Sequence, residues 1–169
     1  MAKSPEYARM LGLLKAQGYR VTGPRRALLR LLAQATKPLS VQEIHAAVNP
    51  PGTKSDDREE EINLVTVYRF ANLLVDLGIA RRVEFGQGYY RYERAESQDG
   101  PHHHHLVCER CGRIEEFQGC EIGNLTLRLE QESGFRVERH QLEVFGTCPQ
   151  CQTLPQTSAA HPALPPHTA

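Results

Sequence analysis

Apolar residues recur at helical spacing in four segments of the first 78 residues. Gly18 follows the first of these segments as a stop signal. Ser40 and Glu43 have the spacing of a capping box at the start of the third. The predicted helices span residues 5–17, 24–35, 41–48 and 64–77.

The pattern changes after the fourth predicted helix. Residues 79–85 and 89–93 read as two strands, and Gly86-Gln87-Gly88 between them reads as a hairpin turn. Helices followed by a β-hairpin are the order of a winged helix-turn-helix, which is a DNA-reading module. The first half of the chain is therefore predicted to bind DNA.

The second half mixes strand and helix patterns. Strands are predicted at 102–108, 113–117 and 135–145, with a helix at 121–133 between the last two. Polar segments without periodicity surround these elements: a solvated loop at 49–61 that contains the acidic stretch 56–61, a linker at 94–101, and a disordered tail from 152. The predicted fold class is α+β.

Charge divides the chain in the same place. Residues 1–92 contain 14 Lys and Arg against 9 Asp and Glu, whereas residues 93–169 contain 6 against 11. The basic first half is suited to binding a polyanion, and the acidic second half, which is rich in His and Cys, is suited to binding cations. The N-terminus has no apolar signal-peptide core and no apolar run reaches membrane-spanning length, so we expect a cytoplasmic protein without membrane contact.

Two Cys-x-x-Cys pairs give the strongest chemical signal. A two-residue spacer lets both thiolates face one ion, so Cys108 and Cys111 with Cys148 and Cys151 predict a closed tetrahedral zinc site that clamps the domain. Redox motifs and free core cysteines are the alternatives. The fifth cysteine, Cys120, stands alone and is predicted to be a buried, inert thiol.

Four consecutive histidines precede the first pair. On a strand, His103 and His105 point to one face and His102 and His104 to the other, so one strand can serve two separate metal sites. A solvated polar run or a purification tag is the alternative interpretation. Candidate partners are Glu93, Glu116, Glu121 and His140.

The fourth predicted helix has polar residues near its start that suit a major groove. Arg69 could pair with guanine, Tyr68 could contact thymine methyl groups, and Thr66 lies beside them. Arginines ahead of the second helix, Arg20 and Arg25 among them, would neutralise phosphates or enter a minor groove. The alternative is that Tyr68 belongs to the core and the arginines only solubilise the surface.

Taken together, these motifs resemble the ferric uptake regulator superfamily of bacterial metal-responsive repressors, and within it a zinc uptake regulator-type member. The resemblance covers about residues 8–151 in unbroken order. The matching motifs are Val21-Thr-x-Pro-Arg25, Thr66-Val-Tyr-Arg69, Leu77-Gly-Ile79, His102-His-His-His-Leu-Val-Cys-x-x-Cys-Gly112, Glu116-Phe117, Gly134-Phe135, and His140 ahead of Cys148-x-x-Cys151.

The resemblance implies a homodimer whose metal occupancy sets the positions of its DNA-binding domains. It implies a winged-helix DNA-binding domain at 1–93, a hinge linker at 94–101, an α/β dimerisation and metal-binding domain at 102–151, and a tail at 152–169. The implied ligands are Cys108, Cys111, Cys148 and Cys151 for one structural zinc per subunit, and Glu93, His103, His105 and Glu116 for the regulatory site. A third site falls on His102, His104 and His140, and recognition contacts fall on Tyr68, Arg69 and Arg20.

The chain departs from the family pattern at three positions. Pro38 stands where iron-type members have a hinge histidine, and Gly123 stands where the third site has a carboxylate, for which Glu121 is a substitute. His104 stands where iron-type members commonly have an aspartate. The predicted regulatory site and the predicted third site therefore each lack one ligand that the family pattern contains.

The leading hypothesis is a zinc-responsive regulator that binds a palindromic double-stranded DNA operator as a metal-loaded homodimer and represses zinc-uptake genes. It takes no small-molecule substrate and is not an enzyme. Regulation by Fe(II) or Mn(II) is the alternative within the same superfamily. More distant alternatives are a zinc storage protein and a zinc-dependent hydrolase, although no His-Glu-x-x-His motif supports the latter.

Overall fold

The computed structural model describes residues 4–51, 61–95, 103–120, 122–138 and 140–153. The chain divides into two compact units, Met1–Ala95 and Glu96–Ala169, which are described separately. The acidic stretch at 56–61 lies almost entirely outside the described residues, and so do the linker from residue 96 and the tail from residue 154. Among the described residues, no helix is both long and apolar enough to cross a membrane.

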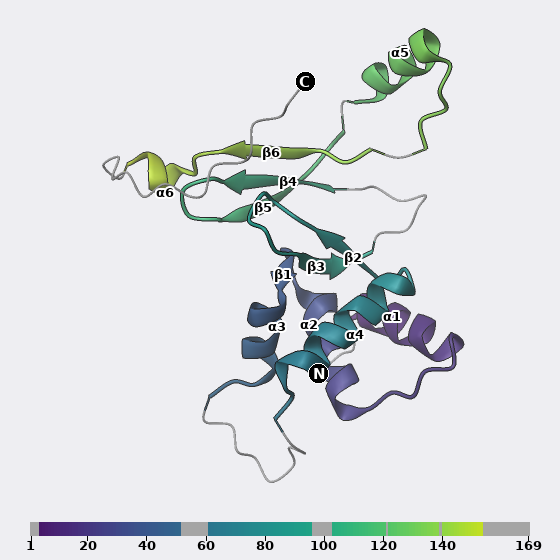
Figure 1. Cartoon of the computed structure of the whole chain (residues 1–169), viewed down its shortest axis with the longest axis vertical. Coiled ribbons are helices and arrows are strands. Elements are labelled where there is room, and N and C mark those ends of the chain that lie inside the picture. Colours follow the sequence, from purple (N-terminus) through teal and green to yellow (C-terminus); the bar gives the residue numbers. More distant parts are fainter. Residues whose placement is uncertain (1–3, 52–60, 96–102, 121, 139, 154–169) are drawn as a thin grey trace. The chain divides into compact units, whose positions relative to one another are not determined.

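Helices form most of the first unit (Figure 1). They are α1 (Pro5–Ala16), α2 (Gly23–Gln34), α3 (Val41–Val48) and α4 (Leu64–Asp76), close to the predicted ranges. Their apolar faces meet in one core, which includes Met10, Leu28, Leu32, Ile44 and Leu74. Burial of these large aliphatic side chains is the main stabilising term of the unit.

Local side-chain contacts explain where the helices begin. The Ser40 hydroxyl accepts a hydrogen bond from the Glu43 backbone N–H at 3.1 Å, and the Glu43 carboxylate accepts one from the Ser40 N–H at 2.8 Å. This confirms the predicted capping box. Asn63 caps α4 in a similar way, since its side-chain oxygen accepts from the Thr66 N–H at 2.8 Å.

A three-stranded sheet completes the first unit. Strands β2 (Ala80–Val83) and β3 (Arg91–Arg94) form the predicted hairpin, although each is shorter than expected. A short strand that was not predicted, β1 (Leu39–Ser40), pairs with the other edge of β3. The buried Arg91 explains this pairing, because its guanidinium donates to Glu43 at 2.5 Å and to the Pro38 carbonyl at 3.3 Å.

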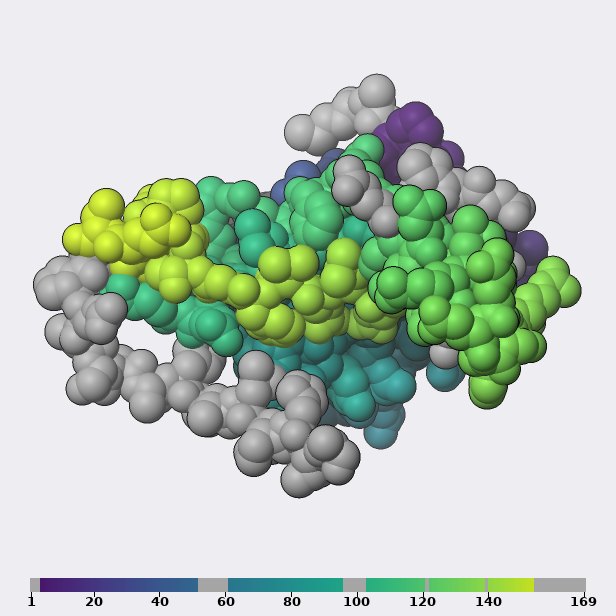
Figure 2. All heavy atoms as spheres, turned by 90° about the horizontal axis from the view of Figure 1, so that it is seen from above, coloured from purple at the N-terminus to yellow at the C-terminus, as the bar shows by residue number. Residues whose placement is uncertain are grey.

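The second unit is built on three strands and a helix. Strand β4 (His103–Cys108) lies at the centre, antiparallel to β5 (Ile114–Gln118) and parallel to β6 (Glu143–Gly146). Helix α5 (Gly123–Ser133) and the short α6 (Pro149–Gln152) lie towards opposite ends of this sheet (Figures 1 and 2). In Figure 2 the yellow-green β6 segment runs between the yellow α6 and the green α5.

Two elements of the second unit differ from the prediction. The strand expected over residues 135–145 is wrong for its first part, because only residues 143–146 pair with β4, and Phe135 is 76% exposed. Alternation of apolar residues indicated a strand, but a strand also needs a partner, and in the parallel register His105 lies opposite Glu143, so most of the expected strand lies beyond the start of β4 at His103. Helix α6 was not predicted at all; it places the second cysteine pair.

Candidate metal centres and nucleic-acid interface

The four paired cysteines converge in the second unit. Cys108 ends β4, Cys111 lies in the turn before β5, Cys148 caps α6 and Cys151 lies within α6. One sulfur from each lies within 4.8 Å of the others, and the Cys111 and Cys148 sulfurs are 3.7 Å apart. In a tetrahedral zinc–thiolate site, bonds of about 2.3 Å place the sulfurs roughly 3.8 Å apart. The donor set therefore fits zinc and leaves no open coordination position.

Backbone contacts hold these cysteines in register. The parallel pairing of β4 with β6 sets Cys108 opposite Gly146, and the Glu109 N–H donates to the Gly146 carbonyl at 2.8 Å. Gly112 has a φ of 71° in the turn after Cys111, a value that favours glycine. Strand pairing thus brings together two motifs that are far apart in sequence.

The cysteine cluster has an uneven proton affinity. Burial raises the pKa of the Cys108 thiol, but hydrogen bonds from the backbone of Cys148, Cys111 and Arg110 outweigh it and lower the pKa to about 6. Burial raises the pKa of Cys151 to about 12, and hydrogen bonds with the neighbouring thiols act in the same direction. One thiolate therefore forms readily, and a divalent cation would supply the charge needed to ionise the rest.

A second group of metal-binding side chains lies on the other face of β4. His103 and His105 are buried, with their rings 4.9 Å apart and nearly perpendicular. The Glu116 carboxylate on β5 lies directly across from His105 and 3.6 Å from His103 Nε2. All three offer ligand atoms within 4.8 Å of one another. Three of the predicted regulatory ligands are thus gathered within one unit.

The fourth predicted regulatory ligand, Glu93, belongs to the first unit. It lies on β3, directly across from Arg81 on β2, and is buried. The Arg81 guanidinium donates to its carboxylate. Glu93 is therefore held in a defined orientation by its own sheet.

A third group combines two predicted ligands with one unexpected side chain. The rings of His104 and His140 are 5.4 Å apart, and the Cys120 sulfur lies 3.1 Å from His140 Nε2. The predicted burial of Cys120 is therefore wrong, because this cysteine is half-buried and its sulfur contacts a histidine. The other two predicted members, His102 and Glu121, lie outside the described residues.

Sequence reasoning had no local signal for the role of Cys120. Its two neighbours in space come from β4 and from the segment before β6, 16 and 20 residues away in the sequence. Single cysteines are commonly buried as small apolar residues, which was the basis of the prediction. The pairing of β4 with both β5 and β6 brings this thiol near the two histidines.

Polar side chains of α4 that were predicted to read DNA are exposed. Val67, Phe70, Ala71 and Leu74 form the buried face of the helix. Tyr68 is 53% exposed, so it does not belong to the core. Thr66 and Arg69 are also exposed. The helix thus presents a polar and aromatic surface opposite its buried side.

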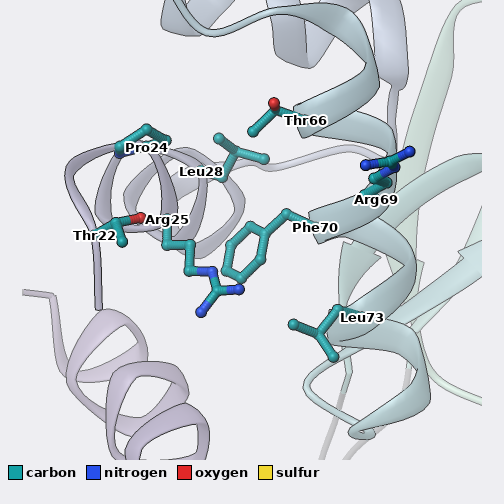
Figure 3. A pocket seen from close by; sticks show the side chains of 8 residues that line it. All are labelled: Thr22, Pro24, Arg25, Leu28, Thr66, Arg69, Phe70 and Leu73. Atoms are coloured by element: carbon teal, nitrogen blue, oxygen red, sulfur yellow. The ribbon is translucent and has the colours of Figure 1, made fainter. Parts of the chain in front are cut away.

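A cleft separates the start of α2 from α4 and gathers several of the predicted DNA contacts (Figure 3). Its volume is about 370 Å³. Apolar side chains line its interior, and Thr22, Arg25, Thr66 and Arg69 add polar groups. Sequence reasoning named Arg25, Thr66 and Arg69 singly but did not anticipate this shared hollow, because it depends on helix packing.

Arg25 is fixed in place beside this cleft. Its guanidinium lies 5.4 Å from the centre of the Phe70 ring, and the two side chains point toward each other in Figure 3. It also lies 5.7 Å from the Tyr19 ring and donates to the Arg20 carbonyl at 2.8 Å. Arg25 is therefore an ordered cation against aromatic rings, whereas Arg20 is exposed.

Comparison with known proteins identifies the relatives of this chain. Residues 16–145 match the model of the "Ferric uptake regulator family". The ferric uptake regulation protein of Neisseria meningitidis serogroup A is 34% identical over 140 residues, which cover 82% of this chain and 90% of the relative. The structure of the Vibrio cholerae ferric uptake regulator is 33% identical with a TM-score of 0.67 and covers 81% of this chain and 98% of its own. A zinc-bound manganese uptake regulator is 32% identical with a TM-score of 0.64, covering 82% and 98%.

The fold is therefore that of a regulator with an N-terminal DNA-binding domain and a C-terminal dimerisation domain, which confirms the predicted α+β class. The chain belongs to the ferric uptake regulator family. It is a metal-responsive transcriptional regulator and not an enzyme, so the hydrolase and storage interpretations are set aside.

Proposed function

We propose that this regulator responds to zinc. The metal-loaded homodimer would bind a palindromic operator and repress zinc-uptake genes. The observation that carries the proposal is the ligand set: His103, His105 and Glu116 lie together in the second unit, and Glu93 would complete the set from the first. Two imidazoles and two carboxylates suit a four-coordinate zinc ion.

Pro38 strengthens the argument for four-coordination. The resemblance places a further hinge ligand at this position, but a proline has no side-chain donor. Pro38 is fully buried, and its carbonyl accepts from Arg91 at 3.3 Å. Manganese prefers six oxygen-rich ligands, whereas zinc is satisfied by four, so the shorter ligand set favours zinc.

The proposed response couples the two units through the metal. Glu93 lies on β3 of the DNA-binding unit, and the other three ligands lie on β4 and β5 of the second unit. An ion held by both sets would favour the arrangement in which they meet. The ion can shift the equilibrium between arrangements only by the difference between its affinity for the DNA-binding arrangement and its affinity for the others. A rearrangement of the DNA-binding domains has been described in the Vibrio cholerae relative.

The four-cysteine cluster has a different proposed role. Because all its donors are soft sulfurs and no position stays open, it would hold a structural zinc ion permanently. This ion would join the β4–β5 turn to α6. It would thus connect the last helix of the second unit to β4, the first strand of that unit. The regulatory ion would exchange while the structural ion stays.

Operator binding would use the exposed face of α4. Tyr68 and Arg69 would read bases in the major groove, while Arg25 and Thr66 at the cleft would contact phosphates. Arg20, which is exposed ahead of α2, would reach the minor groove. Exposed leucines on α5 support the homodimer, since they require an apolar partner.

Iron or manganese regulation is the second candidate. It is favoured by the relatives, because the Neisseria protein is a ferric uptake regulation protein and a similar structure is of a manganese uptake regulator. The two candidates share every residue of the proposed regulatory site. Only the metal that triggers operator binding at physiological free concentration separates them.

A metal-buffered titration distinguishes these candidates. It uses protein that retains the zinc ion at the four-cysteine cluster. The labile metal is removed, and operator binding is followed by fluorescence anisotropy while free Zn(II), Fe(II) or Mn(II) is raised, each in its own buffer. We expect zinc to promote binding at a free concentration at least 100-fold lower than the other two ions. Activation by Fe(II) or Mn(II) with zinc inactive would overturn the zinc proposal.

Two adjacent glutamates on β5 provide a matched test of the regulatory site. Glu116 lies 3.6 Å from His103, whereas Glu115 is exposed and pairs with Arg113 at 2.5 Å. Glu116→Gln removes a carboxylate ligand and is expected to weaken zinc-dependent operator binding at least 100-fold, while Glu115→Gln leaves it unchanged. His103→Ala and Glu93→Ala should abolish the zinc response and leave the dimer intact. Zinc-dependent binding that survives in all three regulatory-site variants would remove these residues from the site.

A further inference from the structure

Glu93, the proposed regulatory ligand from the first unit, has a cationic partner within that unit. Its side chain is 4% exposed and accepts a hydrogen bond from the guanidinium of Arg81, whose side chain is 37% exposed. A buried carboxylate is costly unless positive charge and hydrogen-bond donors lie beside it. Arg81 therefore supplies part of the charge compensation that a metal ion at Glu93 would also supply.

The register of the β-hairpin directs Arg81 to Glu93. Arg81 on β2 is the direct cross-strand partner of Glu93 on β3, and such partners lie on the same face of a sheet. The next residue, Arg82, points to the opposite face, where its guanidinium lies 4.5 Å from the centre of the Tyr90 ring. The two adjacent arginines carry equal charge, but one contacts Glu93 and the other an aromatic ring.

A zinc ion and the Arg81 guanidinium would repel each other if both bound this carboxylate. A zinc–carboxylate bond of about 2.0–2.2 Å and a charged hydrogen bond of about 2.7–2.9 Å would place the two cations roughly 4–6 Å apart. Because Glu93 is buried, water and salt screen this repulsion less than they would at an exposed site. The ion pair and the metal bond therefore oppose each other.

We propose that Arg81 competes with the regulatory metal ion for Glu93. It neutralises the carboxylate in the metal-free protein and gives up this ion pair when zinc takes the carboxylate. By stabilising the metal-free state, Arg81 raises the free zinc concentration at which the site fills. Arg81 thus sets the sensitivity of the response without contacting the metal. This inference rests on the proposed function, because it requires Glu93 to be a ligand.

The competition has a second consequence, for the stability of the first unit. Without Arg81, the metal-free protein keeps a buried carboxylate that has lost a charged partner, and its free energy of unfolding should fall. Zinc would then replace the lost charge and should stabilise such a variant more than the wild type. A purely structural role of Arg81 would instead lower both the stability and the zinc affinity when the arginine is removed.

The zinc affinity of Arg81→Gln tests the proposal, with Arg82→Gln as the matched control. Full-length protein that retains zinc at the four-cysteine cluster is titrated with zinc at neutral pH against a fluorescent chelator of known affinity. The regulatory binding step is identified as the one that Glu93→Gln weakens. We expect Arg81→Gln to tighten this step at least about fivefold. Arg82→Gln removes the same charge from the opposite face and should change it less than about twofold.

A double-variant cycle connects the effect to the ion pair. In the Glu93→Gln background, Arg81→Gln should no longer tighten zinc binding, because the contact that competes with the metal is already lost. Thermal unfolding adds an independent readout. Metal-free Arg81→Gln should melt below metal-free Arg82→Gln, and zinc should narrow this difference.

The outcomes separate failure of this inference from failure of the proposed function. Unchanged or weaker zinc binding in Arg81→Gln, together with the expected loss in Glu93→Gln, would overturn the competition and leave the regulatory site standing. If Glu93→Gln weakens no binding step, Glu93 is not a ligand and both proposals lose it. Arg81→Lys keeps the positive charge and should stay within about twofold of the wild type. Tightening equal to that of Arg81→Gln would show that charge is not the competing factor.

Discussion

Cys108 belongs both to a strand and to the candidate zinc site formed by the four paired cysteines. It ends β4, and its sulfur accepts a hydrogen bond from the Cys148 N–H at 3.2 Å. Its neighbours on β4 alternate between faces, so that His103 and His105 join Glu116 while His104 joins Cys120 and His140. The two-residue period of one strand therefore sorts neighbouring donors into separate groups.

Cys108→Ser is expected to destabilise the second unit, because structural zinc binding is coupled to folding. The variant should lose its tightly held zinc, measured by elemental analysis, and should melt at least about 10 °C lower, which corresponds to a loss of roughly 2 kcal/mol. Cys120→Ser is the matched control and should retain the tightly held zinc and the wild-type melting temperature. Unchanged melting of Cys108→Ser would argue against the zinc clamp.

Helix α4 contributes both to the core and to the proposed DNA interface. One side packs Val67, Phe70 and Leu74 into the core, and the other exposes Tyr68 and Arg69. Because the buried face fixes the rotation of the helix about its axis, the exposed residues have a defined direction. The cleft between the start of α2 and α4 is lined by residues of both helices, Arg25 among them (Figure 3).

Arg69→Ala is expected to weaken operator binding without changing stability. If Arg69 contacts guanine, its loss should weaken binding by about 1–3 kcal/mol and relax the sequence preference at one base pair. If it contacts a phosphate, its loss should reduce the slope of log affinity against log salt concentration by about 1. Arg128→Ala, which removes an exposed arginine from α5, is the control. Competition binding with single-base operator variants at several salt concentrations measures the affinity, the base preference and the salt dependence. Full affinity in Arg69→Ala would remove this residue from the interface.

The two units of the chain differ in how completely they bury their apolar residues. The first has a continuous core of large side chains, whereas none of the 11 residues of α5 in the second is buried. Leu125 and Leu129 are 42% and 44% exposed and lie one helical turn apart. Such a surface favours association, which is consistent with the proposed homodimer.

Leu129→Asp is expected to weaken self-association at least tenfold, because it would place a charge in the apolar interface. Leu13→Asp is the matched control, since Leu13 is 40% exposed but lies on α1 of the first unit. Analytical ultracentrifugation over a range of concentrations measures the monomer–dimer equilibrium. Equal dissociation constants for both variants would place the interface elsewhere.

The helices of the first unit could be predicted from the sequence because their signals are local. Ser40 and Asn63 cap helices through contacts with residues three positions away, and apolar spacing identifies the buried faces. The cysteine pairs were equally clear, since a two-residue spacer suits one ion. Alternation along β4 correctly separated His103 from His104.

Features that depend on distant backbone contacts could not be predicted in this way. The strand expected at 135–145 forms only where β4 offers an edge, and β1 forms because Arg91 holds Pro38 and Glu43 beside β3. Cys120 approaches His140 because β5 and β6 both pair with β4. Short-range contacts depend on residues that are close in the sequence, so they can be predicted from it. Strand pairing depends instead on which strand edges the rest of the fold leaves available. Residue types and spacing therefore identified the candidate metal-binding side chains, and tertiary packing decided which of them meet.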